Sequence, residues 1–291
     1  MKFIKTEENV KICVHDYSHN GTPIIFLHRL EGNAKEWTGV ISHLKKEYDI
    51  VSLDLRGHGK SSKPNSGYHI DRLALDVKVV MDQLKIKQAH LVGNELGSKV
   101  AISLAANYKS RVLSIVCIGS VRNFFGKYGL YDLKDSESIQ NQKKEILTNI
   151  NRRTLPKKDN KEELMTHLKL LTLDEGKDFN TFRHRFYEYE VAQDEAFYYT
   201  LSCKNHVIRE VTKQLFDIDF EHYFLQVDCP ILFMPSDEED ELTHVTESIR
   251  HFATYISPSY VRVIEFSEFL DAAFDFPEEV SKEMIAFYKK I

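Results

Sequence analysis

Short apolar runs recur along the chain and alternate with longer stretches of helical periodicity. The runs cover residues 23–27, 50–55, 89–92, 113–118, 231–234 and 261–266. Continuous apolar runs of this length are typical of strands that are covered on both faces. The pattern therefore predicts a buried, mostly parallel β-sheet.

Between these runs, apolar side chains recur at helical spacing, as they do at Leu73, Val77, Val80 and Met81. Further helices are expected around Val100, Leu104 and Ala105 and after Pro277, where a proline followed by acidic residues is typical of a helix start. Strand and helix alternate from residue 23 to 120, which indicates a doubly wound α/β sheet. Residues 2–17 alternate apolar and polar positions and predict a β-hairpin at the sheet edge.

The alternation stops at residue 121, and the sequence becomes polar, helical and rich in aromatic residues up to about residue 222. This change predicts a helical cap, residues 121–222, that is inserted into a core formed by residues 1–120 and 223–291. Aromatic side chains at helical spacing, such as Phe182 and Phe186, are expected to form the interior of the cap.

Composition narrows the classes of partner and site. The formal charge of −5 comes from 39 basic and 44 acidic residues that are spread along the chain, so nucleic acid is not an expected partner. The residue pattern includes no apolar stretch of the roughly 18 residues that a membrane span needs, and a cytoplasmic protein is expected. The four cysteines lie far apart without a CxxC pair, so neither disulfides nor a metal centre are predicted. We expect no cofactor.

The strongest candidate for chemistry is a strand-to-helix turn at residues 91–98, which reads L-V-G-N-E-L-G-S. Glycines at Gly93 and Gly97 allow a sharp turn that lifts the central side chain to the carboxyl edge of the sheet. That side chain is Glu95. Two glycines four residues apart are common, so the interpretation depends on other blocks that occur in the expected order.

Three further blocks occur in that order. They are F-L-H-R-L-E-G-N at residues 26–33, D-L-R-G-H-G-K-S at 54–61 and V-D-C-P-I-L-F at 227–233. Together with the turn, they resemble the oxyanion loop, the D-x-R-G-x-G-x-S loop, the nucleophile turn and the approach to the catalytic acid in the α/β-hydrolase superfamily. The resemblance covers nearly the whole chain outside the cap. It is strongest to the capped esterase and C–C hydrolase-like members, and it implies an α/β-hydrolase fold.

The resemblance also implies where a catalytic triad would lie. The nucleophile position falls on Glu95, the acid position on Glu239 or Asp240, and the histidine position on Leu270. Triad hydrolysis needs a nucleophile and a histidine that takes its proton. The chain therefore resembles a hydrolase with a degenerate triad. His244, His184 and His206 are candidates for a substitute histidine, although no motif supports them.

The oxyanion loop departs from the family as well. His28 matches a common loop histidine, Arg29 stands where the family has glycine, and the backbone donors would belong to Leu30 and Leu96. Asn94 precedes the nucleophile position and is expected at the pocket. We therefore hypothesise that Glu95 and Arg29 form an ion pair that fills the former active site. The alternative is that Arg29 points to solvent and Glu95 lines a polar pocket alone.

Three functions remain open at this point. The first is a non-classical or catalytically silent hydrolase homologue that binds a small molecule under the cap. The second is an active enzyme on a small ester, lactone or similar substrate, with Glu95 as general base or nucleophile. The third is a protein-interaction module that uses the aromatic residues of the cap and predicts a large exposed apolar patch.

Overall fold

An eight-stranded, mostly parallel sheet lies at the centre of the described chain. The computed structural model describes residues 1–6, 9–17, 21–262 and 271–291. The strand order is β1-β2-β4-β3-β5-β6-β11-β12, in which β1 and β2 pair antiparallel and form the predicted hairpin. The strands are β1 (Lys2–Lys5), β2 (Lys11–Tyr17), β3 (Thr22–Leu27), β4 (Tyr48–Leu53), β5 (Ala89–Asn94), β6 (Val112–Ile118), β11 (Ile231–Met234) and β12 (Ser259–Val261).

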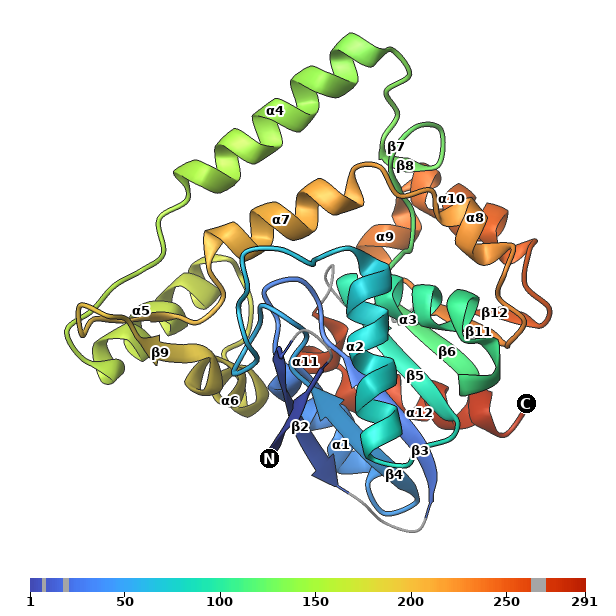
Figure 1. The fold of residues 1–291 in the computed structure, drawn as a ribbon, viewed down its shortest axis with the longest axis horizontal. Helices are drawn as coiled ribbons and strands as arrows, with labels where there is room; N and C mark the ends of the chain where they lie inside the picture. Colours follow the sequence, from blue (N-terminus) through green and yellow to red (C-terminus); the bar gives the residue numbers. More distant parts are fainter. Residues whose placement is uncertain (7–8, 18–20, 263–270) are drawn as a thin grey trace.

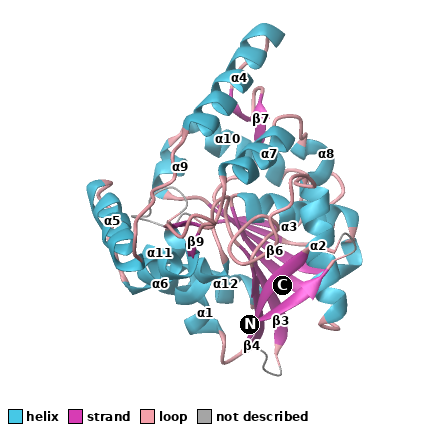
Figure 2. Ribbon diagram, turned by 60° about the vertical axis from the view of Figure 1, so that its left-hand side comes forward, coloured by secondary structure: helices cyan, strands magenta, loops and turns pink. Residues whose placement is uncertain are grey.

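Helices cover both faces of this sheet (Figures 1 and 2). Alternate residues of each strand point to opposite faces, so Ile25 packs with α2 and α3, whereas Ile24 packs with α1 and α12. This explains why the strand sequences are continuously apolar. The helices of the core are η1 (Ala34–Trp37), α1 (Thr38–Leu44), α2 (Ile70–Gln83), α3 (Leu96–Asn107), η2 (Lys109–Arg111), α9 (Asp237–Glu241), α10 (Thr243–Ala253), α11 (Ala272–Asp275) and α12 (Pro277–Tyr288).

The residues assigned to the cap from sequence, 121–222, lie between β6 and β11. They form helices and two small two-stranded sheets. Figure 1 shows α4 reaching away from the sheet, and none of its residues is buried. The elements are β7 (Asn123–Phe125), β8 (Gly129–Tyr131), α4 (Ser136–Arg152), α5 (Lys161–Asp174), α6 (Thr181–Glu190), β9 (Val191–Gln193), β10 (Tyr199–Leu201), α7 (Asn205–Leu215) and α8 (Phe220–Phe224).

The predicted α/β fold is confirmed, with small shifts at the element ends. The run expected at residues 261–266 corresponds to a strand at Ser259–Val261, and residues 263–270 lie outside the described chain. Its pairing with β11 places the strand at one edge of the sheet. Within the described residues, no helix combines the length and the hydropathy of a membrane span.

Candidate functional site

Glu95 lies at a strained turn between β5 and α3, as the motif predicts. Its φ of 45° and ψ of −98° lie in a region that side-chain-bearing residues seldom adopt. Both flanking glycines are required by close packing. A Cβ at Gly93 would overlap the backbone of Gly97 and Ser98, and a Cβ at Gly97 would overlap the backbone of Leu27. The turn therefore holds the Glu95 side chain at the carboxyl end of the sheet.

The Glu95 carboxylate is held by a cation and by backbone donors. Its Oε2 accepts a hydrogen bond from the Leu30 N–H at 3.1 Å, and its Oε1 accepts one from the Lys99 ammonium at 2.7 Å. Burial disfavours the charged form, but the charge and hydrogen bond of Lys99 and the N–H groups of Leu30 and Leu96 outweigh it and lower the pKa of Glu95. The residue is therefore an ionised carboxylate at neutral pH.

The two backbone groups expected to form an oxyanion hole are thus directed at a charge within the protein itself. Leu30 and Leu96 lie on either side of the turn, and both N–H groups stabilise the Glu95 carboxylate. The start of α3 adds the positive end of a helix dipole at the same point. A second anion, such as a tetrahedral oxyanion, would be repelled from this place.

Arg29 has a different partner from the one expected. Its Nη1 donates to Oδ1 of Asp271 at 2.9 Å, whereas the cation beside Glu95 is Lys99. The hypothesis of a Glu95–Arg29 plug is therefore corrected to two separate ion pairs. The physical reason lies in α3: Lys99 is four residues after Glu95, a spacing that brings two side chains together on one helix face.

The two candidates at the acid position differ sharply. Glu239 is buried, and its carboxylate accepts hydrogen bonds from the backbone N–H groups of Ser120 at 2.9 Å and Ser236 at 3.2 Å. These contacts make it the capping-box residue that begins α9. Asp240 is exposed. The histidine position, Leu270, lies outside the described residues.

The histidines considered from sequence have structural or surface roles. His28 is fully buried, its Nε2 accepts from the Leu55 N–H at 2.9 Å, and its other ring nitrogen contacts the Arg29 carbonyl. His184 and His244 are exposed, and His206 is half-buried on α7. Within the described chain, none of these four histidines forms a hydrogen bond or ion pair with Glu95.

Three groups near Glu95 were missed from the sequence, namely Glu36, His58 and Lys99. Asn94 was expected at the pocket, but it is fully buried and does not line the cavity at Glu95. Asn94 donates to Oε1 of Glu36 at 2.8 Å, and burial raises the pKa of Glu36 to about 7 despite the opposing charge of Arg29. His58 is fully buried, and burial lowers its pKa to about 4 although the charge of Glu95 acts in the other direction. The spacing of Lys99 from Glu95 was a usable signal, whereas nothing in the sequence links Glu36 to the turn.

Glu95 opens onto a cavity of about 330 Å³ between the core and residues 121–222. Apolar walls come from the β7–β8 region and from α7, and the charged lining consists of Glu31, Glu95, Lys99 and Arg122. The Nη1 atom of Arg122 is buried and has no hydrogen-bond partner among the residues that the structure describes. A cavity of this size, with apolar walls and few polar groups, is typical of a small-molecule site.

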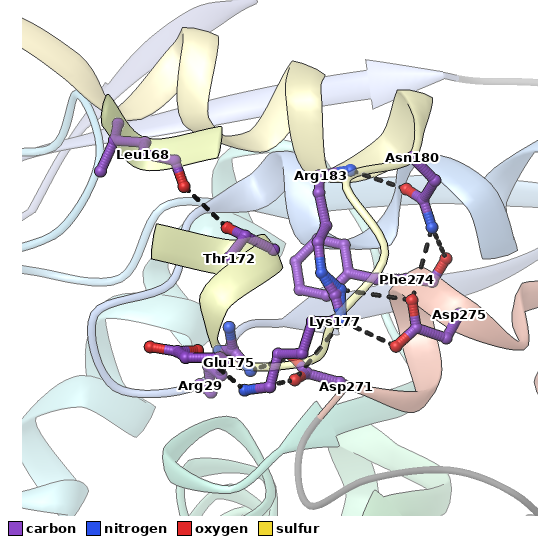
Figure 3. Close-up of polar contacts among 10 residues, drawn as sticks. All are labelled: Arg29, Leu168, Thr172, Glu175, Lys177, Asn180, Arg183, Asp271, Phe274 and Asp275. Atoms are coloured by element: carbon purple, nitrogen blue, oxygen red, sulfur yellow. Dashed lines mark hydrogen bonds and ion pairs between the residues drawn. The ribbon is translucent and has the colours of Figure 1, made fainter. Parts of the chain in front are cut away.

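An ion-pair cluster is centred on Asp271, which follows the histidine position in sequence (Figure 3). The Asp271 side chain is 3% exposed and is contacted by Arg29 at 2.9 Å, Lys177 at 3.0 Å and Arg183 at 3.4 Å. Arg183 also pairs with Asp275 at 2.7 Å. Lys177 and Arg183 belong to the segment 121–222, whereas Arg29 belongs to the oxyanion loop. Asp271 therefore joins three parts of the molecule.

A second polar cluster, also missed from the sequence, contains the ligand types of a metal centre. Cys13, His15 and Asp54 come within 4.8 Å of one another through their ligand atoms. The Tyr189 hydroxyl already contacts all three, at 3.3, 3.0 and 2.8 Å respectively. The Lys35 ammonium lies 3.3 Å from the other nitrogen of His15. The Tyr189 hydroxyl thus links the three side chains through hydrogen bonds. The four cysteines of the chain are buried and free.

Comparison with known proteins agrees with the fold. A family model described as the alpha/beta hydrolase fold matches residues 22–144. The AB hydrolase superfamily protein YisY of Bacillus subtilis is 40% identical over 37% of this chain and 40% of its own length. A 2-(acetamidomethylene)succinate hydrolase of Mesorhizobium japonicum is 31% identical over 34% of this chain and 36% of its own length. The chain thus spans less than half the length of these curated relatives.

Solved structures match over almost the whole chain at lower identity. An E-2-(acetamidomethylene)succinate hydrolase superposes with a TM-score of 0.78 and 17% identity, over 99% of this chain and 98% of the other. An esterase from Exiguobacterium antarcticum gives a TM-score of 0.73 and 20% identity, over 99% and 98%. At these identities the likeness concerns the fold.

Proposed function

We propose, from the premise that this chain is a member of the α/β-hydrolase superfamily, that it binds a small molecule in the Glu95 cavity and lacks Ser-His-acid hydrolysis. One observation carries the proposal. An ionised glutamate stands at the nucleophile turn, accepts a hydrogen bond from the Leu30 N–H and pairs with Lys99. Nucleophile and oxyanion hole are therefore replaced together.

Ser-His-acid hydrolysis is not expected, because the transition state of that reaction would lose its stabilisation. Removing a single oxyanion-hole donor costs serine hydrolases about 10²–10³ in rate. Here Leu30 and Leu96 both stabilise the Glu95 charge, so a substrate oxyanion would lose these donors and meet a negative charge. General-base catalysis is disfavoured as well, because a carboxylate whose pKa is lowered is a weak proton acceptor at neutral pH.

The lining of the cavity suggests the chemistry of the ligand. Lys99 is already paired with Glu95, so the cation left for a ligand is that of Arg122, and apolar walls surround it. Among the described residues the buried Nη1 of Arg122 has no hydrogen-bond partner, and a guanidinium suits bidentate binding of a carboxylate. The named activity of one relative and one solved structure is on 2-(acetamidomethylene)succinate, a dicarboxylate. We therefore propose a small organic acid as the ligand class.

A second candidate is hydrolysis with Glu95 as a nucleophile. It is favoured by the position of Glu95 at the nucleophile turn and by its ionised state. Carboxylate attack on an epoxide carbon would form an ester on Glu95 while the C–O bond of the ring breaks, and the released alkoxide would take up a proton from water. Hydrolysis of that ester would return the free carboxylate. The Lys99 ion pair opposes this attack, because the pair would have to separate before the oxygen could reach a substrate.

Turnover assays on variants of the cavity carboxylates distinguish these two candidates. Wild type, Glu95→Gln and Glu31→Gln are assayed on esters, lactones and epoxides, and Glu31 serves as the control because it is another carboxylate of the same cavity. We expect no turnover above the background of buffer in any of them. Turnover that disappears in Glu95→Gln and persists in Glu31→Gln, with an adduct mass on the Glu95 peptide, would establish the nucleophile.

Binding is tested by calorimetry with succinate and malate. We expect saturable binding to wild type and a loss of at least about tenfold in affinity in Arg122→Gln. Phe197→Ser is the matched control on the segment 121–222, because its side chain is 75% exposed and does not line the cavity. Absence of saturable binding of both acids to wild type contradicts the proposed ligand class.

The protein-interaction module stays a prediction. In its support, the segment 121–222 exposes Leu170, Leu171 and Leu173 on α5, and Phe197 and Tyr198 before β10. The cavity at Glu95 favours a small molecule as the primary ligand.

A further inference from the structure

A second cavity, separate from the one at Glu95, lies where α6 approaches η1 and α1. It has a volume of about 640 Å³ and shares no lining residue with the Glu95 cavity. Its walls come from β2, α1, the loop after β4, and the cap helices α5 and α6. This volume lies within the range of roughly 300–1,000 Å³ that small-molecule sites occupy.

The lining of this cavity carries an excess of positive charge. The basic residues are Lys35, Lys45, Lys60, Lys161 and Arg185, and the acidic one is Glu188. Glu188 lies 3.5 Å from Lys161, so its charge is already matched. The excess is local, because the chain as a whole carries a formal charge of −5.

Four of these cations lack an acidic partner. No carboxylate of the described residues lies within ion-pair distance of Lys35, Lys45, Lys60 or Arg185. The nearest buried acid, Asp54, accepts hydrogen bonds from the Ala34 N–H, the Lys60 N–H and the Tyr189 hydroxyl. The carboxylate oxygens of Asp54 therefore already accept hydrogen bonds from backbone and tyrosine donors.

Tyr189 places two of the cations at the cavity. The Lys60 ammonium lies 4.4 Å from the centre of its ring and the Lys35 ammonium 5.5 Å. The hydroxyl of Tyr189 is fixed by Asp54 and His15 at the other end. Lys35, Lys60 and Tyr189 all line the cavity, so the cation–π contacts hold two ammonium groups at its wall.

Unpaired cations that face one cavity are stabilised by a multiply charged anion. Lysine ammonium groups bind phosphate as point charges, and a guanidinium such as that of Arg185 binds it through two parallel hydrogen bonds. We propose that this cavity is a binding site for a small organic molecule that carries two or more phosphate groups.

Calorimetry at low salt with inorganic tripolyphosphate tests the site, with adenosine triphosphate as an organic probe and citrate as a carboxylate of similar charge. The test variant is Lys45→Gln/Arg185→Gln. Both side chains are exposed, so the double substitution should preserve the fold. The matched control is Lys87→Gln/Lys282→Gln, which removes the same charge from exposed positions outside the cavity. Circular dichroism verifies the fold of both.

We expect one saturable site for tripolyphosphate and adenosine triphosphate, with an affinity that falls as salt rises. The test variant should lose at least about tenfold in affinity, and the control should change by less than about twofold. Equal losses in the two variants would overturn the proposal, because they would indicate non-specific attraction. Absence of saturable binding, or citrate binding as tight as tripolyphosphate, would overturn it as well. Each of these results is independent of the Glu95 cavity.

Discussion

Replacing Asp271 by asparagine should destabilise the fold through the cluster in Figure 3. Asp271 is the shared partner of Arg29, Lys177 and Arg183, at 2.9, 3.0 and 3.4 Å. The asparagine side chain fits the same space but carries no charge. The substitution would therefore leave three cations close together at a buried position.

The magnitude follows from the exposure of the partners. Breaking a buried ion pair by removing one member costs about 3–5 kcal/mol. The side chains of Arg29 and Lys177 are 22% and 28% exposed, and Arg183 keeps Asp275 at 2.7 Å, so solvent and the second acid reduce the loss. We expect a decrease of about 2–3 kcal/mol in the free energy of unfolding at pH 7.

Urea unfolding followed by circular dichroism measures this loss, with Asp82→Asn as the control. Asp82 also pairs with two cations, Lys78 and Arg111, but it is 42% exposed, so its replacement should cost about 1 kcal/mol or less. The pKa of Asp271 is lowered because three cations outweigh its burial. Its contribution is therefore present above the ordinary pKa of 3.8 and is lost as pH falls through the lower folded value. Equal losses for Asp271→Asn and Asp82→Asn would refute the reasoning.

Three further predictions concern the turn and its surroundings. Gly97→Ala should lower the free energy of unfolding by about 3 kcal/mol in the same urea assay, because the new Cβ would overlap the backbone of Leu27. Gly126→Ala is the control: its Cβ would meet no atom, and its φ of +98° should cost about 1 kcal/mol. The pKa of Glu36 is about 7 in the folded protein, against an ordinary value of 4.5. As pH rises between these values, the free energy of unfolding of wild type should fall by about 1–3 kcal/mol relative to that of Glu36→Gln. Parallel curves of unfolding free energy against pH would contradict this. Lys99→Gln should raise the pKa of Glu95 in a carboxyl NMR titration, and an unchanged midpoint would count against the ion pair.

Much of the fold could be predicted because local pattern and burial agree in this chain. Each parallel strand lies between two helical layers, so its sequence is continuously apolar and easy to recognise. The hairpin at residues 2–17 was predicted from alternation and is confirmed by the pairing of Lys2 with Val14 and of Lys5 with Lys11. The end of the 261–266 run could not be placed, because periodicity alone does not fix element boundaries.

The candidate site was predictable only where its residues belong to a sequence motif. Glu95 and its glycines form one motif, and the donors at Leu30 and Leu96 followed from position. The partner of Arg29 did not, because Asp271 is 242 residues away. Glu239 matched the acid position by spacing, but the structure shows that its oxygens accept backbone N–H groups. A carboxylate that caps a helix and one that orients a histidine are indistinguishable in sequence.

Carbon-13 NMR titration of the Glu95 carboxyl tests the central claim most directly, namely that an ionised glutamate occupies the oxyanion donors. The resonance is assigned by its disappearance in Glu95→Gln. We predict a midpoint below the ordinary value of 4.5, because the charge and hydrogen bond of Lys99 and the Leu30 and Leu96 N–H groups favour the charged form. A midpoint above 4.5 would contradict the claim, because the Leu30 and Leu96 N–H groups would then not favour the charged form of Glu95. A Glu95 with a raised pKa could also act as a general acid or base.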